Sequence, residues 1–197
     1  MPAPTAHTGT ARDLEVVSHA LQRVAEELGT LVDHEIALTD FRADRLTQRP
    51  AGSGSVHVSF RQRYRMGALT HGCLLLPLAA AQSLAGHFLM MPASDVAERQ
   101  ARTELDPLAK DALIELSGFV ASALQESLLE DFGVRAEVRT GGCQGVREGV
   151  RPAFPYEEGT PLLVGRAVAR FGATAPFEVT LMLPELPGVF EPELALN

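Results

Sequence analysis

The sequence has little positive charge and few cysteines. Seventeen Lys and Arg face 25 Asp and Glu, so the net charge is −8. This balance argues against nucleic-acid binding, because a phosphate backbone requires a basic surface. Cys73 and Cys143 lie in no CxxC or Cys/His pattern, and the six histidines show no metal-ligand spacing. We expect buried, reduced thiols and no metal site.

Long apolar runs are also lacking. No run reaches the roughly 18 apolar residues that a membrane span needs. The longest apolar cluster, residues 73–91, is interrupted by proline, glycine and polar residues. The N-terminus lacks the charged start and apolar run of a signal peptide. We therefore expect a cytoplasmic protein, with no membrane contact and with enough hydrophobic residues, 46% of the chain, for a substantial core.

Hydrophobic periodicity predicts three helices and six strands. The predicted helices are Arg12–Leu28 (stopped by Gly29), Pro77–Met90 and Asp106–Gly133. The predicted strands are Leu31–Phe41, Val56–Met66, Leu69–Leu76, Val134–Thr140, Pro161–Phe171 and Pro176–Leu183. Residues 94–103 are compatible with a short helix or a linker, and composition indicates loops at 47–54 and 141–159.

The order of these elements repeats. Helix, strand, loop and hairpin occur twice, which predicts an α+β fold of duplicated αβββ units that form an antiparallel sheet covered by helices. We expect a single domain over 12–184. Its two repeats would span about 12–77 and 105–184, joined by a helix at 77–91 and a linker at 92–105. A disordered tail would precede the domain at 1–11, and a second tail would follow at 185–197.

The helix Asp106–Gly133 has the clearest boundaries. Asp106 can cap its free N–H groups, Pro107 sits where no N–H is needed, and Gly133 can adopt the left-handed conformation that ends a helix. Its apolar stripe is Leu108, Ala112, Leu116, Phe119, Val120, Ala123, Leu124 and Leu128. The opposite stripe, nearly one line on the helix surface, is Asp111, Glu115, Gly118, Ser122 and Glu126.

The stretch from about Val56 to Leu183 resembles the CheC/CheX chemotaxis phosphatases, whose duplicated fold is shared with the middle domain of the flagellar switch protein FliM. The family motif is Asp or Ser, three residues, Glu, two residues and Asn, with a Pro about two dozen residues later. Asp111 and Glu115 match it in identity and spacing, whereas Gly118 stands at the Asn position and Gly141 near the Pro position. The first helix carries no motif, so the arrangement resembles the one-site CheX.

The resemblance implies a bacterial signalling protein that engages a phosphorylated response-regulator receiver in chemotaxis or a related two-component pathway. The receiver would supply Mg²⁺ and a lysine, so this chain would need no cofactor of its own. Glu115, the candidate catalytic residue, would pair with that lysine, and Asp111, Gly118 and Ser122 would complete the docking surface. A glycine side chain cannot orient water as an Asn amide can, and the sole asparagine is the terminal Asn197. We therefore expect weak or lost phosphatase activity.

Other interpretations remain open. The carboxylates are also typical of a solvated helix face, and Gly118 of close packing against a backbone or a second copy of the helix. Arg61, Arg63 and Arg65 alternate on one strand, which is typical of a solvated sheet face, of a docking surface for an acidic partner, or of a homodimer interface. A non-enzymatic FliM-like interaction or oligomerisation module is the main functional alternative, and a small-ligand sensor is a further one.

Overall fold

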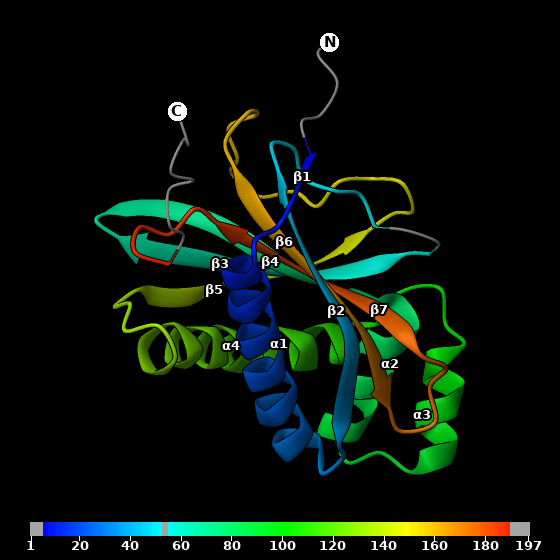
Figure 1. The fold of residues 1–197 in the computed structure, drawn as a ribbon. Helices are drawn as coiled ribbons and strands as arrows, with labels where there is room; N and C mark the ends of the chain where they lie inside the picture. The colour runs from blue at the N-terminus through cyan, green and yellow to red at the C-terminus, as the bar shows by residue number, and fades with distance from the viewer. Residues whose placement is uncertain (1–5, 53–54, 190–197) are drawn as a thin grey trace, which may run out of the picture.

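One layer of helices lies on one face of a twisted antiparallel sheet (Figure 1). The computed structural model describes residues 6–52 and 55–189. The helices are α1 (Ala11–Val32), α2 (Leu78–Phe88), α3 (Ala93–Gln100) and α4 (Pro107–Glu130). The strands are β1 (Ala6–Thr8), β2 (Ile36–Leu46), β3 (His57–Met66), β4 (Ala68–Pro77), β5 (Glu137–Val146), β6 (Leu162–Phe171) and β7 (Phe177–Pro184). The predicted α+β class is confirmed.

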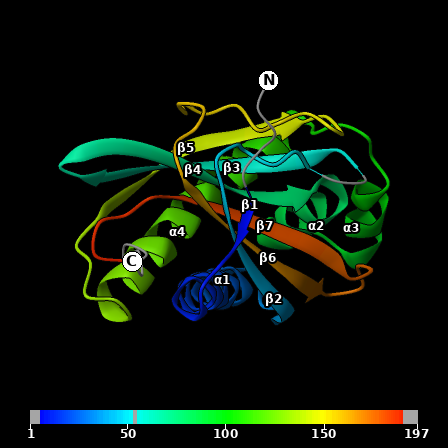
Figure 2. The ribbon, with the colours of Figure 1, turned by 45° about the horizontal axis from the view of Figure 1, so that its top comes forward.

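The sheet interlocks the two halves of the chain. Its strand order is β1-β2-β6-β7-β4-β3-β5, and every pairing is antiparallel. Apart from β1, the order is symmetric about the central β7–β4 pair. β2 and β5 are the outermost strands, β6 and β3 lie next to them, and β7 and β4 meet at the centre. The first strand of each half lies against the second strand of the other half. The two hairpins meet at the centre, where both α4 and α1 lie beneath the sheet (Figure 2).

The N-terminal residues correct one expectation. Residues 6–8, predicted to belong to a disordered tail, form β1 and pair with Asp44–Leu46. Thr10 then caps α1, accepting a hydrogen bond from the Asp13 N–H while the Asp13 carboxylate accepts one from the Thr10 N–H. This capping box satisfies two N–H groups that the helix leaves free. Residues 1–5 of the predicted tail lie outside the described residues.

Helix α1 is longer than predicted. It continues through Gly29 to Val32, and Asp33, with φ 53°, supplies the left-handed cap that was expected from Gly29. A Cβ at Gly29 would lie 2.9 Å from the carbonyl oxygen of His34, so this glycine permits the chain to turn back closely against the helix. The following strand accordingly begins at Ile36 and runs on to Leu46.

The glycine-rich stretch after Thr140 is also corrected. Residues 141–146, predicted as loop, continue β5 beside β3. The register shifts between Phe60 and Gln62, and Gly142 has a φ of 82° at this irregularity. A Cβ at Gly141 would lie 3.2 Å from the Cβ of Arg61. Glycines thus bring the two backbones together in a bulge, which composition alone does not distinguish from a loop.

The main core lies between the helices and the sheet, and it includes Val17, Leu21, Phe60, Leu116, Leu124 and Leu181. A second apolar cluster covers part of the opposite face of the sheet: Cys73, Leu75, Val146, Phe154, Leu162, Val164 and Met182. His57 and Ser59 are buried, whereas Arg63 and Arg65 are exposed. The outer face is therefore solvated only in part. Leu186 and Val189 are buried in the main core, so the first part of the predicted C-terminal tail is packed.

Helix α4 begins as predicted. The Asp106 carboxylate accepts a hydrogen bond from the Ala109 N–H at 2.8 Å, and Pro107 is the first helical residue. The helix ends at Glu130, and Gly133 adopts a φ of 67° just beyond it. By length and composition α4 is the one described helix that could cross a membrane, but 56% of its most apolar window is buried in this fold. A central core helix has the same composition.

Candidate functional site

The outward face of α4 carries the predicted stripe. Asp111, Glu115, Ser122 and Glu126 are exposed and Gly118 is half-buried. An added Cβ at Gly118 would meet no atom within 4 Å. The interpretation of Gly118 as a close-packing glycine within the chain is therefore wrong. The position is open to solvent, and the fold itself offers no reason for a glycine there.

Charge divides this stripe into two parts. Toward the C-terminal end, Glu126 and Glu130 accept hydrogen bonds from Arg23 of α1 at 3.1 and 2.8 Å. Toward the N-terminal end, Asp111 and Glu115 have no ion pair or side-chain hydrogen bond within the described residues. The first pair of carboxylates helps to hold α1 on α4, whereas the second pair is available to another molecule.

The polar side chains near Gly118 do not replace the absent amide. Gln125 uses its Oε1 to accept a hydrogen bond from the Val138 N–H at 2.9 Å, which joins α4 to β5. Ser117 points inward and donates to the Ile114 carbonyl oxygen at 2.7 Å. Ser122 is exposed, but it lies about one helical turn beyond Gly118. The face therefore presents two available carboxylates, Asp111 and Glu115, and no amide at the position of Gly118.

Three apolar side chains flank the carboxylates. Leu108, Ile114 and Phe119 are 49%, 40% and 36% exposed. Leu108 and Phe119 were predicted on the buried stripe, and the structure places both at its margins. Helical angle shows why: Leu108 and Phe119 lie about 60–80° from Asp111, and Ile114 lies about 60° away on the other side. A helical wheel centred on Asp111 would have identified them as apolar residues on both sides of the carboxylates.

The two thiols lie away from solvent. Cys73 and Cys143 are buried and unpaired, and burial raises the pKa of the Cys73 thiol to about 12. Burial also raises the pKa of Cys143. Within residues 6–52 and 55–189, no cluster of three or more His, Cys, Asp and Glu side chains has the geometry to hold a metal ion. The α4 face can offer charge and shape, and neither thiol lies on it.

No protein-family model and no curated protein matches the sequence, but solved structures do. FliY from Thermotoga maritima superposes with a TM-score of 0.67 at 14% identity, covering 89% of this chain and 91% of FliY. FliM from H. pylori, solved in a complex with FliG, gives a TM-score of 0.60 at 11% identity, covering 89% and 94% of the two chains. The chemotaxis protein CheX from Desulfovibrio desulfuricans gives 0.52 at 12% identity, covering 85% and 97%.

The chain has the fold of FliY, FliM and CheX. At identities of 10–14% the likeness establishes the fold alone. The resemblance that the residues suggested is confirmed at that level. The motif at Asp111 and Glu115, the roles given to Gly118 and Ser122, and the receiver partner stay predictions.

Proposed function

We propose that this protein is a cytoplasmic, CheX-like signalling protein that binds a phosphorylated response-regulator receiver through α4 and has little or no phosphatase activity. The observation that carries the proposal is the pair of exposed carboxylates, Asp111 and Glu115, left without partners in the described structure beside an open Gly118. The Mg²⁺ in the complex would belong to the receiver. The bacterial, two-component context comes with the same resemblance.

The chemistry explains why binding and turnover separate here. Hydrolysis of a phosphoaspartate requires a water in line with the phosphoryl group, and an amide can hold such a water by donating and accepting hydrogen bonds. Glu115 can pair with a lysine of the receiver, but a carboxylate alone does not fix the water. With Gln125 bonded to β5, no amide is presented at Gly118. Docking is retained in this proposal, and positioning of water is lost.

The test uses a CheY-type receiver, chosen from a gene beside the one that encodes this protein. Binding is measured to the receiver activated with beryllofluoride and to the unactivated receiver, and phosphoaspartate decay is followed with and without the protein. We expect binding to the activated form, and a decay rate within about twofold of the receiver alone. Rapid, Glu115-dependent decay would contradict the loss of activity, and equal binding to both forms would contradict the receiver proposal.

Four variants separate the roles on α4. Glu115→Gln removes the charge proposed to meet the receiver's lysine, so we expect weaker binding by about fivefold. Glu157→Gln, an exposed residue of the loop on the opposite face, is the matched control and should leave binding unchanged. Gly118→Asn restores the amide in open space, and we expect faster decay than in Gly118→Ala, which fills the same space without an amide. Equal decay in the last two would show that the amide is not the missing element.

A non-enzymatic interaction module is the second candidate. The exposed Leu108, Ile114 and Phe119 favour it, because a partly apolar helix face is typical of protein interfaces. FliM, which is similar in fold, has been solved in a complex with FliG. Binding of a partner independently of phosphorylation, with an unchanged phosphoryl lifetime, would favour this candidate over the first.

A further inference from the structure

The edge of the sheet at β2 is open over part of its length. β2 pairs with β6 on one side, and on the other side β1 covers only Asp44–Leu46. The Gly9 N–H extends this cover by donating to the Ala43 carbonyl oxygen at 2.9 Å. From Ile36 to Arg42, no described strand lies on the outer side of β2. An uncovered edge presents backbone N–H and C=O groups that another extended chain can pair with.

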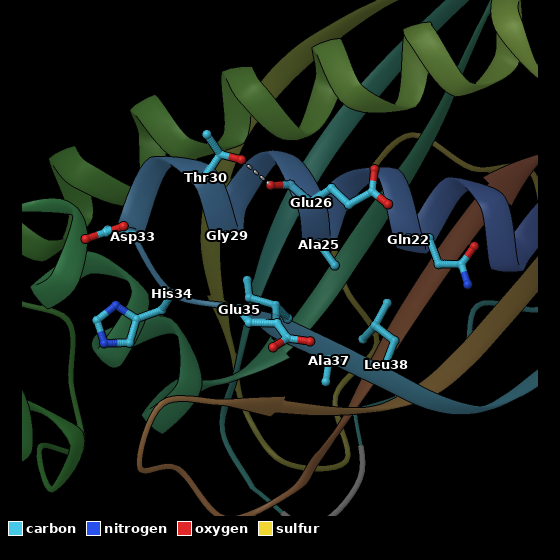
Figure 3. Close-up of a pocket in the computed structure, with 11 residues that line it drawn as sticks. Gln22, Ala25, Glu26, Gly29, Thr30, Asp33, His34, Glu35, Ala37 and Leu38 are labelled. Atoms are coloured by element: carbon cyan, nitrogen blue, oxygen red, sulfur yellow. Dashed lines mark hydrogen bonds between the residues drawn. The ribbon is translucent and has the colours of Figure 1, made fainter.

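A groove runs between α1 and this open edge of β2 (Figure 3). Its volume is about 860 Å³, and small residues open it, among them Ala25, Gly29 and Ala37. Figure 3 shows Ala25 and Gly29 on the helix above, and Ala37 and Leu38 on the strand below. An added strand would therefore pair with β2 along one edge and pack one of its faces against α1.

The charged residues that line the groove are all acidic. Glu26, Asp33 and Glu35 line it, and none of its lining residues is Lys or Arg. All three acidic residues are exposed. Arg23, about one turn before Glu26 on α1, donates hydrogen bonds to Glu126 and Glu130 of α4 and does not line the groove. Asp33 and Glu35 have no ion pair within the part of the chain that the structure describes. A chain bound here would bring its own positive charge.

We propose that the groove between α1 and β2 binds an extended peptide segment that contains Lys or Arg, by addition of a strand to the edge of β2. Backbone hydrogen bonds to β2 would supply affinity, and the three carboxylates would select basic side chains. This surface is separate from the Asp111–Glu115 face of α4, and the proposal does not depend on receiver binding.

The structure also limits the length of such a segment. The register of β2 shifts between Thr39 and Arg42, and Asp40 has a φ of 55°. Regular pairing would thus run from Ile36 to Thr39, about 13 Å of strand. Beyond the bulge, Gly9 and β1 occupy the edge. We expect recognition of a short segment of about four to six residues.

The probe is an eight-residue, end-capped peptide of alternating Thr and Lys with a fluorescent label. Its binding to the full chain is followed by fluorescence anisotropy, and the bound edge is located by amide chemical shifts. Two matched peptides accompany it: one with Glu in place of Lys, and one N-methylated at every second residue, which keeps the charge but removes backbone donors. We expect the lysine peptide to bind, weakening as salt is raised, and both matched peptides to bind at least about tenfold more weakly.

Protein variants locate the charge effect. Glu26→Gln together with Glu35→Gln should weaken binding of the lysine peptide by about fivefold. Glu148→Gln, at an exposed position in the turn just after β5, the strand at the other edge of the sheet, should leave it unchanged. Thermal unfolding checks that each variant is folded. Equal binding of the N-methylated or the glutamate peptide, shifts away from Ile36–Thr39, or a second copy of the protein occupying this edge would overturn the proposal.

Discussion

Gln62 lies fully buried in β3, yet neither its side-chain oxygen nor its nitrogen has a hydrogen-bond partner within the described residues. An unpaired amide in the interior costs free energy because it has given up its hydrogen bonds to water. We predict that Gln62→Met, which keeps the length of the side chain and removes its polar atoms, raises the free energy of unfolding by about 1 kcal/mol. Urea denaturation measures this change.

Gln82 provides the matched comparison for Gln62. It is also buried, and its Oε1 likewise has no hydrogen-bond partner within the described residues, but its amide nitrogen donates to the Glu104 carbonyl oxygen at 2.8 Å. Gln82→Met should therefore lower the free energy of unfolding by about 1 kcal/mol. If Gln62→Met is destabilising to the same extent, the Gln62 amide is satisfied in solution and the prediction fails.

Single residues also show what the sequence could disclose about the site. The caps Asp106 and Gly133 were predictable, because each acts on the backbone within a few residues of itself. The exposure of Asp111 and Glu115 followed from helical spacing. The open space at Gly118 and the bond between Gln125 and β5 were not predictable, since both depend on where β5 lies.

At the scale of elements, α1 is joined to β2 through one buried carboxylate. Asp13 is fully buried and accepts hydrogen bonds from Nε and Nη2 of Arg45 at 2.8 and 2.9 Å. Burial acts to raise the pKa of Asp13, but its hydrogen bonds from Arg45 and the Thr10 N–H outweigh burial and leave the pKa below its ordinary value. The stabilisation is present above about pH 4 and is lost as the pH falls below that range.

We predict that Asp13→Ala lowers the free energy of unfolding by about 3 kcal/mol, since it removes half of the capping box and the ion pair between Asp13 and Arg45. Glu15→Ala, in the same helical turn, is the control. Its ion pair with Arg12 is exposed at both ends, so the loss should stay within about 0.5 kcal/mol. Denaturant unfolding at neutral pH compares them, and equal losses would contradict the anchoring role of Asp13.

Elements were predicted well where periodicity is local and poorly where glycine has a tertiary role. The hairpins β3–β4 and β6–β7 follow from alternation, and the structure confirms them. Gly29 and the pair at 141–142 were misread as a stop and a loop. Gly29 and Gly141 permit a close approach by a segment that sequence spacing does not reveal, and Gly142 adopts the positive φ of the bulge. The pairing of β2 with β6 was equally hidden, since it joins residues 116 to 135 positions apart.

At the scale of the whole molecule, three elements meet in a cluster of rings. His34 follows α1, His87 lies in the last turn of α2, and Phe171 ends β6. The ring centroids of His34 and His87 are 4.2 Å apart, and both rings contact Phe171, at 5.9 and 5.3 Å. Burial, with a smaller contribution from His34, lowers the pKa of His87. The cluster therefore packs most favourably with His87 neutral.

The lowered pKa of His87 makes the stability of the fold sensitive to mild acid. Below about pH 6.5 the unfolded chain protonates His87 more readily than the folded protein does, so stability falls with pH until the lower pKa of the folded state is passed. We predict that His87→Gln reduces the loss of unfolding free energy between about pH 7.5 and pH 5 relative to wild type. His71, whose pKa burial also lowers, contributes a background common to both proteins. His7→Gln, at an exposed position of β1, is the control. An unchanged pH dependence of the unfolding free energy in His87→Gln would show that protonation of His87 does not destabilise the contact between the three elements.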